Sequence, residues 1–234
     1  MQPANYRGAL GRAEAGTRSA ERAEFFWKTY QWMSLGLGLT GMVAYVVSST
    51  PALVNIVLGN PIVFFGLIIA ELGLVVAFSS MAQRISFGKA AAMFLIYSIL
   101  NGATFSIIFF AYTEQSIFHV FLISGGSFAG LSLFGMVTKR DLSPMGQFLT
   151  FGLIGIIIAS VVNMFVQSEG LYKILSYVGV LVFAGLTAYD TQKLKNIFDA
   201  RGEGGNLALR GALTLYLDFI NLFLFLLRIL GRRR

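Results

Sequence analysis

The sequence predicts an all-α membrane protein, a bundle in which seven helices cross the bilayer. Of its 234 residues, 56% are hydrophobic and only 12% are charged, about half the charged fraction of an average soluble domain. The mean hydropathy is +0.72. The apolar residues form continuous runs, whereas the strands of an outer-membrane barrel alternate apolar and polar residues. This composition argues against a water-soluble enzyme and excludes a disordered chain.

The first 24 residues differ from the rest of the chain. They are mostly small or polar, with four arginines and three glutamates. They contain no apolar core followed by a cleavage site, so we expect no cleaved signal peptide. We expect residues 1–24 to form a flexible cytoplasmic tail, disordered or weakly helical, and residues 25–234 to form the membrane domain.

Seven apolar stretches follow the tail, each close to the roughly 20 residues that a helix needs to cross the hydrocarbon core. Turn-forming or charged residues separate them, from Thr50-Pro51 after the first stretch to the glycine-rich segment 201–206 before the last. The start of the second span is open, because Gly59-Asn60-Pro61 could itself begin that helix. We expect spans at 28–50, 54–79, 88–111, 117–138, 145–167, 172–192 and 210–230.

The distribution of Lys and Arg predicts the orientation. The tail through Lys28 has five, the loop after the second span has two, the loop after the fourth has two and the loop after the sixth has four. The opposite loops hold only Lys173, which predicts a cytoplasmic N-terminus. Seven spans then place the C-terminus outside, although Arg228 and residues 232–234 oppose that placement. We favour seven full spans over a last segment that re-enters, because 210–230 is long enough to cross.

Several classes of site are not indicated. There is no cysteine and only one histidine, His119, which excludes thiolate chemistry and a multi-histidine metal site within one chain. No phosphate-binding loop occurs. The net charge of +7 lies largely in the loops, so it does not indicate nucleic-acid binding. We therefore expect no enzyme activity, no catalytic residue, no cofactor and no nucleic-acid partner.

Small residues such as Gly130 and Gly135 predict close helix packing.

Three acids lie inside spans, namely Glu71, Asp190 and Asp218. A carboxylate in hydrocarbon costs several kcal/mol, so each should face a partner or a water-filled cavity. Asp190 is near the inner end of the sixth span, and Asp218 is about 12 Å along the seventh. Both therefore fall in the inner half of the membrane and could meet. Facing carboxylates would share a proton and form a pH-sensitive latch, or coordinate a hard cation such as Ca²⁺.

Structural alternatives to these roles stay open. Asp190 could cap a helix end or pair with a nearby lysine, and Asp218 could make a purely structural hydrogen bond. Glu71 could line the same cavity or stabilise the helices. Arg84, the first cation after Glu71 and toward the inner face, could neutralise one of the acids or be an ordinary cytoplasmic loop residue.

Three segments carry a resemblance to a known family. The stretch 183–198 (FAGLTAYDTQKLKNIF) closely resembles the signature of the Bax inhibitor family, also called the transmembrane Bax-inhibitor-motif proteins. The segment 215–228 resembles the last helix of that family, and 138–143 resembles its loop before the fifth span. The likeness runs from about residue 25 to the end, and the overall pattern resembles the bacterial branch. It implies a seven-helix bundle with the last helix central, in the bacterial cytoplasmic (inner) membrane.

The resemblance also implies a function and a set of site residues. Members of the family are associated with pH-sensitive calcium leak, which is linked to two aspartates on the sixth and seventh helices. These positions fall on Asp190 and Asp218, which would form the pH-sensing gate and contact Ca²⁺. A glutamate of the second helix falls on Glu71, in the cation path. An arginine that competes for the aspartates has Arg84 as its nearest candidate, although the longer basic run of the family is absent here.

We therefore expect a calcium-permeable, pH-sensitive leak channel, with calcium and membrane lipid as its partners. The alternative is a regulator that acts by protein contact, since some bacterial relatives modulate a membrane-bound ATP-dependent protease. In that case the N-terminal 24 residues would serve as a flexible handle. A third hypothesis, proton-coupled transport of another substrate, also uses intramembrane acids.

Overall fold

The computed structural model describes residues 4–82, 84–202 and 206–234, with side chains from residue 16 onward. These residues form helices and no named strand, and seven of the helices are long and apolar enough to cross a membrane. The predicted all-α, seven-span fold is therefore confirmed. The spanning helices are α1 (Ala4–Ser49), α3 (Pro61–Met81), α4 (Phe87–Phe105) with its short continuation α5 (Ile108–Ala111), α6 (Glu114–Val137), α7 (Ser143–Val166), α8 (Glu169–Arg201) and α9 (Leu207–Leu230).

The second span begins at Pro61, later than the expected residue 54. The intervening segment forms a separate short helix, α2 (Pro51–Val57). Asn60 explains the start of α3, because its side chain accepts hydrogen bonds from the backbone N–H groups of Ile62 and Val63. Proline follows at the first helical position, where its missing N–H is not needed. The alternative start at Gly59-Asn60-Pro61 is therefore the one that the structure adopts.

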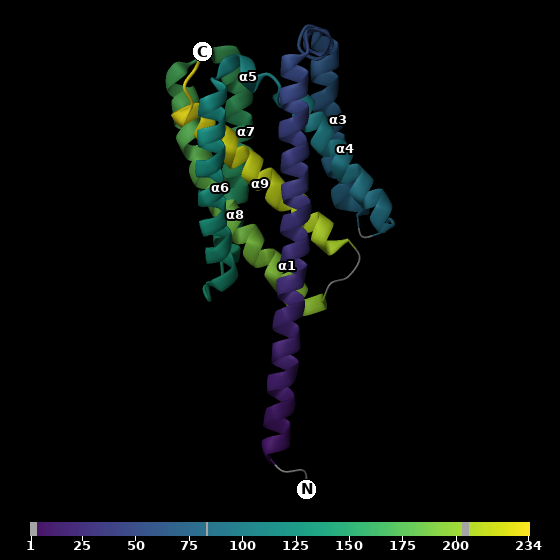
Figure 1. The fold of residues 1–234 in the computed structure, drawn as a ribbon. Helices are drawn as coiled ribbons and strands as arrows, with labels where there is room; N and C mark the ends of the chain where they lie inside the picture. The colour runs from purple at the N-terminus through teal and green to yellow at the C-terminus, as the bar shows by residue number, and fades with distance from the viewer. Residues whose placement is uncertain (1–3, 83, 203–205) are drawn as a thin grey trace.

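The first span belongs to a helix that is much longer than a membrane crossing. α1 is continuous over 46 residues, and the expected boundary at residue 24 falls inside it without a break. The division into a flexible tail and a membrane domain stays a prediction. Figure 1 shows the N-terminal part of α1 projecting away from the other helices.

The last helix is the most buried of the seven. In the most apolar window of α9, 56% of the residues are buried, compared with 11% in α3 and in α7. α9 packs against α8, α1, α6 and α4, and Figure 1 shows it running obliquely between them. Its core side chains include Leu215, Tyr216 and Leu222, each at most 1% exposed. The expected central position of the last helix agrees with this packing.

The C-terminus lies at the opposite end of the bundle from the N-terminus (Figure 1). After α9 the chain pairs with the segment between α5 and α6. The Thr113 N–H donates to the carbonyl of Arg232 at 3.1 Å, and the Arg234 N–H donates to the carbonyl of Ala111 at 3.2 Å. α9 therefore crosses the whole bundle and does not re-enter. Which end faces the cytoplasm stays a prediction from the distribution of charge.

Candidate functional site

Asp190 and Asp218 lie on two helices that pack along each other, α8 and α9. The Asp218 residue is only 5% exposed, and the Asp190 side chain is 14% exposed. Asp190 lies close enough to Asp218 for the two carboxylates to interact electrostatically. The structure thus brings the two sequence-predicted aspartates into one electrostatic site beside the central helix.

The Asp218 carboxylate is incompletely satisfied. Its Oδ2 atom is buried and has no hydrogen-bond partner among the residues that the structure describes. A buried polar atom without a partner costs roughly 1–3 kcal/mol, and more when the group is charged. The geometry therefore leaves this oxygen available to a proton, a water molecule or a cation.

Lys193 is the cation nearest to this pair. Its Nζ lies 4.0 Å from Asp190 Oδ1, and its side chain is 54% exposed. The same residue lines a pocket of about 500 Å³ at the ends of α8 and α9, together with Gln192, Arg201 and Arg210. Lys193 is thus placed between the aspartates and a polar pocket at the predicted cytoplasmic end of the bundle.

The two residues after Asp190 hold this part of α8 in place. The Thr191 hydroxyl is 2.9 Å from that of Ser132 on α6, and Ser132 also hydrogen-bonds with the Tyr30 hydroxyl on α1. The Gln192 side-chain amide is hydrogen-bonded to the backbone of the loop between α6 and α7. It donates to the carbonyl of Arg140 and accepts from the N–H of Leu142, both at 2.8 Å.

These positioning residues were not predicted. Thr191 and Gln192 are ordinary polar residues at the inner end of a span. Their position directly after Asp190 is a signal that sequence analysis could have used.

Glu71 lies in a different network, on another side of α9. Its carboxylate accepts hydrogen bonds from the Asn101 amide at 3.1 Å and from the Thr104 hydroxyl, both on α4. Asn101 Oδ1 accepts in turn from the Tyr216 hydroxyl of α9 at 3.0 Å, and Tyr216 hydrogen-bonds with Thr40 of α1.

This network separates Glu71 from the aspartates. Tyr216 and Asp218 are two residues apart on one helix, so their side chains leave α9 in nearly opposite directions. Within the described part of the chain no contact joins Glu71 to Asp190 or Asp218. Its predicted place in the cation path stays a prediction.

Arg84 is exposed in the short connection between α3 and α4. No hydrogen bond or ion pair joins its side chain to Asp190 or Asp218 in the described ranges, so its predicted competition for an aspartate stays a prediction. The connection itself is anchored to the start of α9. The buried Asn206 side chain donates to the carbonyls of Ala82 at 2.6 Å and Ile85 at 3.0 Å.

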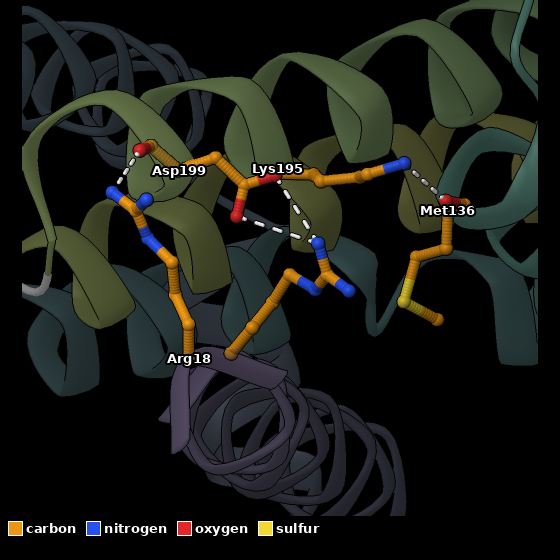
Figure 2. A network of polar contacts seen from close by, with 5 residues as sticks. Arg18, Met136, Lys195 and Asp199 are labelled. Atoms are coloured by element: carbon orange, nitrogen blue, oxygen red, sulfur yellow. Dashed lines mark hydrogen bonds and ion pairs between the residues drawn. The ribbon is translucent and has the colours of Figure 1, made fainter. Parts of the chain in front are cut away.

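The N-terminal extension of α1 is tied to the end of α8, as Figure 2 shows. Arg18 donates to the Asp199 carbonyl at 2.9 Å, and Arg22 Nη1 lies 3.2 Å from Asp199 Oδ2. Lys195 donates to the carbonyl of Met136 near the end of α6 at 2.7 Å. The Arg22–Asp199 pair is partly exposed, so it stabilises the fold only weakly. The two arginine contacts join α1 to the end of α8 where α1 leaves the bundle.

The donor set for a cation is limited. Among the residues that the structure describes, no group of three or more His, Asp or Glu residues could hold a metal ion. The two aspartates would supply two carboxylates to a passing Ca²⁺, and carbonyl groups or water would supply the other oxygens that this ion takes. This arrangement fits a transient contact better than a tight resident site.

Comparison with known proteins gives a consistent relationship along nearly the whole chain. Residues 22–234 match the family described as "Inhibitor of apoptosis-promoting Bax1". The chain is 49% identical over 213 residues to Inner membrane protein YbhL of Escherichia coli (strain K12), covering 88% of this chain and 91% of the relative. An uncharacterized protein of Borreliella burgdorferi is 45% identical over 215 residues, which is 90% of this chain and 93% of the relative. An uncharacterized membrane protein of Streptococcus pyogenes serotype M1 is 40% identical over 215 residues, with 89% and 93% covered.

Proposed function

The chain belongs to the Bax inhibitor family, and we propose that this bacterial inner-membrane member is a pH-sensitive, calcium-permeable leak channel gated by Asp190 and Asp218. The observation that carries the proposal is the buried Asp218 carboxylate, which has an unpaired Oδ2 and lies in the field of Asp190. Glu71 differs in this respect, because hydrogen-bond donors contact both of its oxygens.

The proposed gate works through charge. When both aspartates are ionised, their carboxylates repel each other across the α8–α9 contact and attract a cation. When the pair takes up one proton, the repulsion between two negative charges is lost. Proton uptake therefore changes both the packing of α8 on α9 and the affinity of the site for Ca²⁺. In the described residues, Asp190 and Lys193 are the ionisable groups that act on Asp218.

Calcium flux into dye-loaded proteoliposomes, scanned from about pH 5 to about pH 8, tests the proposal because a shared proton titrates as a property of the pair. The full chain should give a flux above that of empty liposomes, with a distinct pH midpoint. Asp190→Asn should displace or abolish that midpoint. Flux no greater than that of empty liposomes at every pH would contradict the channel proposal.

A second candidate function, regulation through protein contact, is favoured by the length of α1. A helix of 46 residues extends about 69 Å, more than twice the roughly 30 Å hydrocarbon core. The excess projects from the bundle (Figure 1) and offers a surface to a membrane partner, such as an ATP-dependent protease.

Deletion of residues 1–15 separates the two functions, because it leaves Arg18 and Arg22 to contact Asp199. Under the regulatory proposal the shortened chain loses its effect on proteolysis and keeps any calcium flux. If the shortened chain loses calcium flux and leaves proteolysis unchanged, the regulatory proposal is contradicted.

A further inference from the structure

A basic pocket lies at the end of the bundle that holds the C-terminus. It has a volume of about 470 Å³ and is formed where α7 ends, α8 begins and α9 ends. Its cations are Lys173, Arg228 and Arg233, and its one acid is Glu169. Lys173 and Glu169 are 3.9 Å apart and largely exposed, so this pair neutralises little of the pocket's charge. The pocket therefore carries an excess of positive charge.

An apolar groove of about 500 Å³ continues from this pocket between α7, α8 and α9. The two cavities share Asn163, Tyr172 and Arg228 in their walls. The rest of the groove is mainly aliphatic and aromatic, with Leu153 and Leu175 among its lining residues. Because α7, α8 and α9 all span the membrane, the groove lies at the depth of the lipid chains and the pocket at the depth of the headgroups.

The arginines are held by aromatic rings and not by acids. The Arg228 guanidinium lies 5.4 Å from the ring centre of Tyr172 and 4.9 Å from that of Phe225. Arg233 lies 5.6 Å from the Tyr172 ring and pairs with Tyr112 through an isolated antiparallel β-bridge. No carboxylate forms an ion pair with Arg228 or Arg233 in the part of the chain that the structure describes. Their charge is thus oriented and still available to an anion.

We propose that the basic pocket and the apolar groove together bind one anionic phospholipid, with its phosphate at Arg228 and Arg233 and one acyl chain between α7, α8 and α9. Basic pockets between membrane helices attract anionic headgroups, and burial of each methylene of a chain adds to the affinity. Free phosphate would fill the basic pocket alone and leave the groove unused. An arginine at a helix end can also simply extend its charged group toward water. That role would not require an apolar groove beside the arginine.

The test compares lipid binding by the full chain in detergent, measured by native mass spectrometry. The probes are phosphatidylglycerol and phosphatidylcholine with identical acyl chains, and inorganic phosphate. The unaltered chain should prefer phosphatidylglycerol. The double variant R228Q/R233Q should lose roughly 25-fold in that affinity, since each cation near a headgroup is worth about fivefold. R232Q removes one arginine charge from the same C-terminal segment, outside the pocket lining, and should bind normally.

A second pair of variants tests the groove. Ser160 lines it, whereas Ile158 on the same helix does not and is 59% exposed. S160F should weaken phosphatidylglycerol binding without changing phosphate binding, and I158F should change neither. K173Q, which leaves the Arg233–Tyr112 contact intact, should lose roughly fivefold even if the double arginine variant unfolds.

Equal binding of the two lipids, unaffected by the arginine and lysine variants, would overturn the proposal. If inorganic phosphate bound as tightly as phosphatidylglycerol and S160F had no effect, the pocket would instead be a site for free phosphate.

Discussion

Lys193 lies one helical turn after Asp190 on α8, and its Nζ is 4.0 Å from Asp190 Oδ1. This lysine is 54% exposed, whereas Asp218 is buried and Asp190 is mostly covered. Its positive charge is close enough to interact with the Asp190 carboxylate. Lys193 therefore helps to set the pH at which the proposed gate takes up its proton.

Replacing Lys193 with glutamine should raise the pH midpoint of calcium flux. Without the cation the ionised pair is less stable, so the proton is released at a higher pH. An exposed pair is worth under about 1 kcal/mol, which corresponds to a displacement of roughly half a pH unit. Lys139→Gln removes the same charge from an exposed loop position and should leave the midpoint unchanged. Equal shifts in both variants would mean that only net charge matters.

Replacing Tyr216 with phenylalanine should destabilise the bundle by about 1 kcal/mol, because buried hydrogen bonds to Asn101 and Thr40 are lost. The change can be measured as a lower midpoint of thermal unfolding in detergent. Tyr177→Phe is a matched control, since Tyr177 is 60% exposed on α8. If the two variants unfold at the same temperature, the Tyr216 hydroxyl contributes nothing to stability.

Gly135 and Gly130 on α6 should respond differently to alanine. A Cβ atom at Gly135 would overlap the backbone carbonyl of Ala188 on α8, whereas one at Gly130 would meet nothing within 4 Å. Gly135→Ala should therefore cost about 1–3 kcal/mol of stability by forcing α6 away from α8. Gly130→Ala should be neutral or slightly stabilising, because alanine is the better helix former. Thermal unfolding of both variants checks this, and equal effects would contradict the observed packing.

Asp141, in the loop between α6 and α7, should stabilise the protein in a pH-dependent way. The Ser143 N–H donates to Asp141 Oδ1 at 2.9 Å, and hydrogen bonds from Ser143 hold the pKa of this carboxyl below its ordinary value. A lowered folded-state pKa means that the contribution is present above the unfolded-state pKa and is lost as the pH falls through the folded-state pKa.

Comparing the wild-type chain with Asp141→Ala should reveal this contribution. The wild type should unfold at a slightly higher temperature at neutral pH, and the difference should shrink by about pH 3. Asp141→Asn keeps the acceptor and cannot titrate, so its advantage over alanine should not vary with pH. A wild-type advantage that stays constant across this range would assign the effect to the acceptor alone.

The seven spans could be predicted because the hydropathy of a membrane helix is a local property. A continuous apolar run of about 20 residues can cross only as a helix, and α7 begins and ends within two residues of the expected 145–167. The continuation of α1 into the polar tail could not be read in this way. The extended helix is held by contacts of Arg18 and Arg22 with Asp199. Asp199 lies far from both arginines in the sequence.

The candidate site was partly predictable for the same reason. Acids inside apolar runs are conspicuous, and their distances along two consecutive helices place Asp190 and Asp218 at similar depth. The rotation of each helix about its axis is not encoded locally. Sequence reasoning therefore could not separate Glu71 from the aspartates, and it could not tell that Gly135 faces a neighbouring helix while Gly130 does not.

The central claim is that Asp218 carries the pH response of a calcium leak. The most direct measurement is the pH midpoint of calcium flux in proteoliposomes for Asp218→Asn, beside Asp199→Asn as a control. Asp199 lies at the end of α8 and pairs with Arg22, away from the aspartate pair. We expect a displaced or absent midpoint for Asp218→Asn and an unchanged one for the control. If Asp218→Asn leaves the midpoint where the wild type has it, Asp218 does not carry the pH response.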